Sequence, residues 1–88
     1  MSSKIIEYDL CAPGKNYDDL YEAIKSYDAW AKITKSTWFI KTEDSCIVIR
    51  DKLLKHIDNN DRLFVGELTG TAAWHNVICD NQYLKDHL

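Results

Sequence analysis

Two carboxylates near the start of the chain have the residue types and spacing for metal chemistry. Glu7 and Asp9 are separated by one residue in a stretch that alternates apolar and polar side chains, so they share one face of a predicted strand. Duplicated by a dimer axis, they could hold a hard cation such as Mg²⁺ for phosphodiester hydrolysis, with Asp9 as the catalytic residue. The alternative is that Asp9, at the end of its strand, is a turn or capping residue.

A loop before the first predicted helix has the composition of an anion site. Gly14, Lys15 and Asn16 supply a glycine, a lysine and free backbone N–H groups at a helix start, which suits a phosphate or carboxylate. The alternative is a structural loop in which Asn16 caps the helix. The sequence leaves both roles open.

A second loop follows the last predicted strand. Thr69, Gly70 and Thr71 are small or carry hydroxyl groups and come shortly before Trp74. A nucleotide could therefore approach the backbone while the indole stacks on its base. The alternative is a turn at Gly70 and an indole that fills the edge of a small core.

Composition and charge argue against several function classes. The net charge is −3, and nine lysines are accompanied by only two arginines, which disfavours tight binding to duplex nucleic acid. The three cysteines are Cys11, Cys46 and Cys79, an odd number without a C-x-x-C pair, which argues against a disulfide framework or a cysteine zinc site. With no signal-peptide core or apolar stretch long enough to span a membrane, we expect a cytoplasmic protein without a membrane partner.

The elements that must position these residues follow one another at short spacing. Alternating and β-branched segments predict strands at residues 4–10, 30–34, 37–42 and 62–68. Between them, apolar spacing of three and four residues predicts two helices: one with Leu20, Ala23, Ile24 and Tyr27 on its apolar face, the other with Cys46, Ile49, Leu53, Leu54 and Ile57. The order βαββαβ predicts a single α+β domain over residues 1–88, of the ferredoxin-like split βαβ type. Its four-stranded antiparallel sheet would carry both helices on one face.

The C-terminal residues and the second face of the sheet indicate whether the chain pairs with another protein. Residues 71–88 fit either a short helix or an edge strand. The second face of the sheet has no predicted helix to cover apolar residues such as Ile5 and Phe39, and exposed apolar patches commonly mark interfaces. We therefore expect a homodimer, joined either face to face or edge to edge.

Several short segments together resemble a known family. They include Tyr8-Asp9-Leu10, Pro13-Gly14-Lys15, Ser36-Thr37-Trp38, residues 49–54, and Leu68-Thr69-Gly70 with Ala72-Ala73-Trp74. Over residues 4–74 the chain is similar to small bacterial and phage Cas-two-like (SinR-like) proteins, relatives of the CRISPR adaptation subunit. The resemblance implies a ferredoxin-like homodimer, possible roles in phage defence, and a first-strand aspartate linked to metal-dependent nuclease activity, which Asp9 matches.

Three functions follow as hypotheses. The first is a non-catalytic homodimer that binds a nucleotide-type ligand or a protein partner. The second is a Mg²⁺-dependent nuclease that uses Asp9, with Glu7, from each subunit. The third is a module for protein interaction alone. The acidic surface and the incomplete acid cluster favour binding over catalysis.

Overall fold

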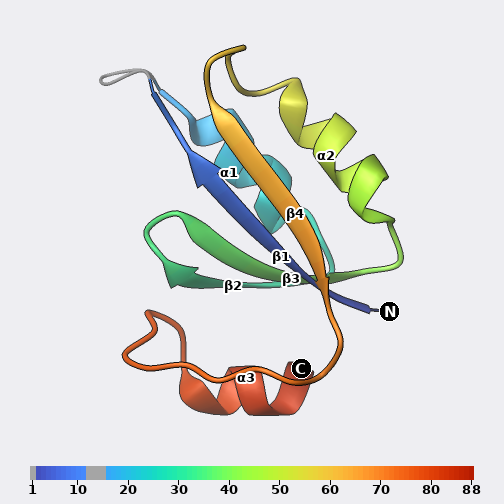
Figure 1. Cartoon of the computed structure of the whole chain (residues 1–88), viewed down its shortest axis with the longest axis vertical. Coiled ribbons are helices and arrows are strands. Elements are labelled where there is room, and N and C mark those ends of the chain that lie inside the picture. Colours follow the sequence, from blue (N-terminus) through green and yellow to red (C-terminus); the bar gives the residue numbers. More distant parts are fainter. Residues whose placement is uncertain (1, 12–15) are drawn as a thin grey trace.

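The computed structural model describes residues 2–11 and 16–88. Along the chain its elements are β1 (Ser2–Asp9), α1 (Asp18–Lys25), β2 (Ala29–Thr34), β3 (Thr37–Thr42), α2 (Cys46–Leu54), β4 (Arg62–Leu68) and α3 (Asn81–His87). The strands form one sheet in the order β2-β3-β1-β4, and all neighbouring pairs are antiparallel (Figure 1). This arrangement confirms the predicted ferredoxin-like α+β fold, with β1 and β3 in the centre of the sheet.

Local side-chain bonds explain where the helices begin. The Ser45 hydroxyl accepts from the Val48 backbone N–H at 3.2 Å and so caps α2. Before α1 the Asn16 side-chain oxygen Oδ1 accepts from the Asp18 N–H at 2.8 Å, but Tyr17 occupies the cap position and makes no side-chain cap bond. Across residues 2–11 and 16–88, every helix is too short or too polar to cross a bilayer.

The main core lies between the sheet and the pair α1 and α2. It is built from apolar side chains of the central strands and the inner helix faces: Ile6, Tyr8, Tyr17, Leu20, Ile24, Trp38, Ile40, Ile49 and Leu53. One expectation for α2 was wrong. Leu54 was placed on the buried face but is half-exposed, because it follows Leu53 by one residue and the helix turns about 100° per residue.

A second core lies on the opposite face of the sheet and corrects another expectation. This face was expected to lack a covering helix, but the C-terminal tail crosses it and ends in α3, below the sheet in Figure 1. Ala31, Phe39 and Leu84 are buried there, with Trp74 and Val77 packed against them. The tail therefore forms a helix rather than an edge strand. Among the described residues, the part of this face around Glu7, Asp9 and Phe64 stays open.

Candidate functional site

The first-strand carboxylate Asp9 lies at the exposed end of the β1–β4 ladder, opposite Arg62. The Arg62 guanidinium donates from Nη1 to Asp9 Oδ2 at 2.8 Å. Both side chains are largely exposed, 66% for Asp9 and 74% for Arg62. Asp9 is thus held by an ion pair at the surface, with one carboxylate oxygen already engaged.

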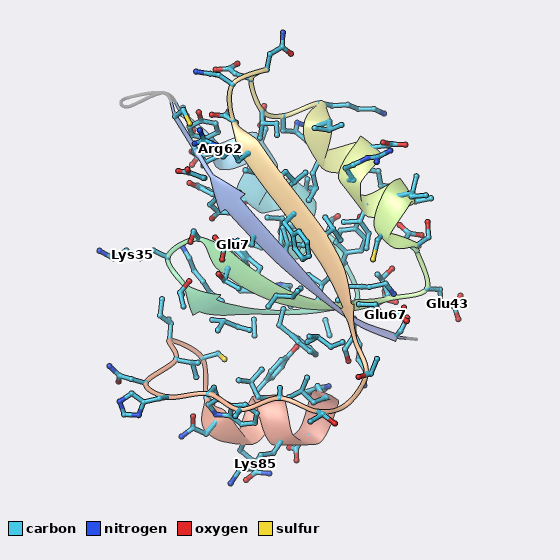
Figure 2. All side chains as sticks on the ribbon, in the orientation of Figure 1. Glu7, Lys35, Glu43, Arg62, Glu67 and Lys85 are labelled. Atoms are coloured by element: carbon cyan, nitrogen blue, oxygen red, sulfur yellow. The ribbon has the colours of Figure 1, made fainter. Side chains whose placement is uncertain are left out.

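Glu7 lies on the same face, two residues earlier on β1. Its Oε1 atom accepts a hydrogen bond from the Thr37 hydroxyl on the neighbouring strand β3. Glu7, Asp9, Arg62 and Phe64 contribute to the lining of a shallow depression of about 260 Å³. Figure 2 labels Glu7 beside β1 and Arg62 near the start of β4.

The structure thus brings the two predicted metal ligands to one surface, as the alternation of β1 requires. Each has a protein partner, however, and residues 2–11 and 16–88 contain no group of three or more histidine, cysteine or acidic side chains able to hold a metal ion. A Mg²⁺ ion takes six ligands and carboxylates supply only one or two of them in most sites. A catalytic cation here would have to displace Arg62 or recruit ligands from a second copy.

The first candidate ligand loop is described only in part. Gly14 and Lys15 lie outside the described residues. Asn16 is exposed, and its side-chain oxygen accepts from the Asp18 N–H. This bond forms a local turn before α1, but the cap position belongs to Tyr17 and has no side-chain cap bond, so the prediction that Asn16 caps the helix is wrong.

The second candidate loop turns its aromatic side chain inward. Thr69, Gly70 and Thr71 are exposed, and Gly70 has a φ of 93°, a conformation that favours glycine. Trp74 packs against the second core, and its indole N–H donates to the Asn81 side-chain oxygen at 3.1 Å. The indole is therefore part of the attachment of the tail to the sheet.

The strand residues that precede the two candidate loops, Asp9 and Leu68, lie at opposite ends of the β1–β4 ladder. Asp9, before the first loop, pairs with Arg62, whereas Ser3 pairs with Leu68, before the second loop. Six residues of β-strand separate these positions, which corresponds to about 20 Å. A single small ligand cannot contact both Asp9 and Leu68 of one chain.

Sequence reasoning missed a surface formed by the outer edge of β4 and the outer side of α2. Phe64 is 63% exposed and Ile47 is 62% exposed. They flank a groove of about 270 Å³ that is also lined by Cys46, Arg50 and Val65. The signal was present in the sequence: α2 carries more apolar residues than one buried face requires, with Ile47, Val48 and Leu54 left outside.

A buried cation stabilises the other end of β4. The Lys4 side chain is only 3% exposed, and its ammonium group lies 3.1 Å from Glu67 Oε1. Hydrogen bonding and charge attraction from Lys4 lower the pKa of Glu67 below its usual value. This pair joins β1 to β4 on the helix side of the sheet, with the Lys4 side chain buried and the Glu67 side chain 55% exposed.

Comparisons of the chain with family models, with curated proteins and with solved structures give no match. The relationship to the Cas-two-like proteins therefore stays a prediction.

Proposed function

We propose that this chain is a non-catalytic homodimeric binding protein, joined edge to edge through β4 and α2, that binds a protein partner on the open face of the combined sheet. The observation that carries the proposal is the gathering of exposed apolar side chains, Phe64 and Ile47 above all, around the outer edge of β4. Among the described residues no strand pairs with this edge. An open edge bordered by apolar groups is a template for pairing with another strand.

The sequence of β4 suits antiparallel pairing with a second copy of itself. If the twofold axis passes at Val65, Phe64 of one copy lies opposite Gly66 of the other. Within each chain the Phe64 ring already covers Gly66, since a Cβ atom added there would lie 2.9 Å from the ring. In this register Leu63 faces Glu67 of the second copy and no like charges are opposed. The pairing would place two aromatic rings over two glycines at the axis.

The outer side of α2 is self-complementary in the same way. Ile47 and Leu54 are two turns apart and both exposed. Between them lie Arg50 and Asp51, whose side chains form an ion pair at 3.0 Å. When two copies of α2 pack antiparallel, Ile47 meets Leu54 of the second copy, and Arg50 can reach Asp51 of the second copy. The interface would then have two apolar Ile47–Leu54 contacts, one on each side of two symmetry-related Arg50–Asp51 ion pairs.

This dimer separates the carboxylates that a nuclease would need to combine. Asp9 pairs with Arg62, and in the proposed register Arg62 lies opposite Leu68 of the second copy. The two Asp9 residues are then displaced by about 20 Å along the strands, with further separation across them. Carboxylates at that distance cannot share one metal ion, so the dimer supports binding in place of Mg²⁺-dependent hydrolysis.

A protein is the partner that fits the surface best. Pairing through β4 leaves the open parts of both sheets continuous, with the exposed Phe64 rings near the centre and Glu7, Asp9 and Arg62 around them. An apolar centre with a charged border is the usual anatomy of a protein interface. A nucleotide is less suited, because Trp74 packs on the second core and its indole N–H already donates to Asn81.

A pair of charge variants tests the dimer geometry. We expect Arg50→Asp and Asp51→Arg each to weaken self-association by about ten-fold, because each places like charges opposite one another. Mixed in equal amounts, the two variants should form a heterodimer with an affinity close to that of the wild type, measured by native mass spectrometry. The double variant Arg50→Asp/Asp51→Arg should also dimerise. Single variants that dimerise like the wild type, or a mixture that fails to associate, would contradict the proposed arrangement.

Binding to a protein is tested separately with the assembled dimer. Asp9→Lys reverses charge at the border of the open face, away from the dimer axis. Phe64→Ser removes the apolar centre of that face but also lies at the axis, so it is used only once sedimentation shows that the variant is still a dimer. In a pull-down from the cell of origin, both variants should lose proteins that the wild type retains, while a variant on the opposite side of the domain, Glu22→Lys on α1, should keep them. Loss of the same proteins with Glu22→Lys, or retention with Phe64→Ser, would overturn this part of the proposal.

A further inference from the structure

We infer that the cavity between the C-terminal tail and the sheet is a binding site for a small neutral apolar molecule. The cavity has a volume of about 130 Å³ and lies on the face of the sheet opposite α1 and α2. It is separate from the edge of β4 where we place the dimer. The inference therefore does not depend on the proposed function.

The lining of the cavity selects against water. Apolar side chains from both layers surround it: Ile5, Ile33, Phe39 and Leu68 from the sheet, and Ala72, Ala73, Trp74, Leu84 and Leu88 from the tail. The one polar side-chain group among them, the Trp74 indole N–H, is already bonded to Asn81. A buried water needs two to four polar partners, so a site of this composition favours an apolar ligand over water.

The volume sets the size of the ligand. An apolar cavity of about 150 Å³ lined by similar residues stays dry and binds benzene or xenon. A space of about 130 Å³ therefore suits one aromatic ring or a short hydrocarbon chain. It is too small for a nucleotide, and a charged group would lose its hydration without gaining a partner.

Two alanines mark the entrance. Ala72 and Ala73 line the cavity and are also exposed to solvent, so they lie where the cavity meets the surface. Their methyl groups leave room that a larger side chain would fill. They follow Gly70, whose φ of 93° turns the chain from β4 into the tail. The sequence feature that suggested a ligand loop, a run of small residues before a tryptophan, thus forms one wall of an apolar site.

Titration with benzene, followed by ¹H–¹⁵N NMR, tests the inference directly. We expect saturable shift changes at the amides of Ala72, Ala73 and Leu84. Ala73→Leu replaces a methyl group at the entrance by an isobutyl group and should weaken benzene binding by about ten-fold or more. Thr71→Leu is the matched control, because Thr71 is exposed in the same segment but does not line the cavity. It should bind benzene like the wild type.

A second variant keeps the test independent of how Ala73→Leu folds. Leu88→Ala trims the lining at the end of the chain and enlarges the cavity, so this variant should gain affinity for naphthalene relative to benzene. Shifts that never saturate, or that are the same in Ala73→Leu and Thr71→Leu, would show only surface partition and overturn the inference. An unchanged ratio of naphthalene to benzene affinity in Leu88→Ala would do so as well.

Discussion

Arg62 donates from Nη1 to Asp9 Oδ2 at 2.8 Å, directly across the ladder that joins β4 to β1. The aspartate that the sequence offers as a metal ligand is therefore paired with a guanidinium, which cannot lose its charge. The pair is exposed, so its contribution to stability is small. Its role in the proposed dimer is to supply opposite charges beside Phe64 on the open face of the sheet.

Asp9→Asn separates the structural role of this aspartate from a catalytic one. The variant loses an exposed ion pair, so the free energy of unfolding should fall by about 0–1 kcal/mol, measured by urea denaturation. Neither wild type nor variant should cleave DNA, RNA or cyclic nucleotides with Mg²⁺ or Mn²⁺ present. Metal-dependent cleavage by the wild type that disappears in the variant would restore the nuclease hypothesis.

Trp74→Ala tests whether the indole holds the tail on the sheet. Removing it deletes packing against the second core and the bond to Asn81, so stability should fall by about 3 kcal/mol, near the low end for tryptophan truncation. Trp30→Ala is the comparison, because Trp30 is more exposed, on the edge strand β2. Thermal melts should show a clearly smaller loss for Trp30→Ala. Equal losses would mean that Trp74 does not anchor the tail.

Two tyrosines make a matched pair, because the Tyr8 hydroxyl has two hydrogen-bond partners, Trp38 and Lys35, and the Tyr27 hydroxyl has none among the described residues. The buried Trp38 indole N–H donates to the Tyr8 hydroxyl oxygen at 2.9 Å. Tyr8→Phe leaves that N–H without an acceptor and should cost about 1–3 kcal/mol in chemical denaturation. The Tyr27 hydroxyl, by contrast, is buried with no partner among the described residues, so Tyr27→Phe should be neutral or stabilising. A larger loss for Tyr27→Phe would contradict this assignment.

The Lys4–Glu67 pair predicts a specific pH dependence. The pKa of Glu67 is lowered in the folded chain, so the stability from its charge is present above the unfolded pKa and is lost as pH falls through the folded pKa. Glu67→Gln should lower the melting temperature at pH 7, and its difference from the wild type should shrink below about pH 4.5. A difference that is constant from pH 7 to pH 3 would show that the charge of Glu67 contributes nothing.

The local patterns were sufficient to predict the central sheet. Thr37–Thr42 and Arg62–Leu68 form strands over the residues predicted for them, because alternation and turn residues fix such segments locally. The cap at Ser45 was likewise apparent, since it depends on a bond three residues away.

The tail could not be predicted in this way, because its conformation depends on distant contacts. Among the described residues, a single backbone hydrogen bond joins the middle of the tail to the sheet. In it the Ile78 N–H donates to the Ile33 carbonyl oxygen. Leu84 is buried against Ala31 and Phe39, which lie far away in sequence on the face that the tail covers. Similarly, the sequence could not predict that Arg62 is the partner of Asp9. That pairing depends on the register between β1 and β4, which is set only in the folded sheet.

The central claim, pairing of two copies through β4 and α2, is tested most directly by sedimentation velocity on two matched variants. Ile47 and Ile78 are 62% and 60% exposed, but only Ile47 borders the groove beside β4. At about 50 μM, where an interface of standard size is commonly occupied, wild type and Ile78→Glu should sediment as dimers and Ile47→Glu as a monomer. A monomeric wild type, or a dimer that survives Ile47→Glu and dissociates in Ile78→Glu, would contradict the proposed interface.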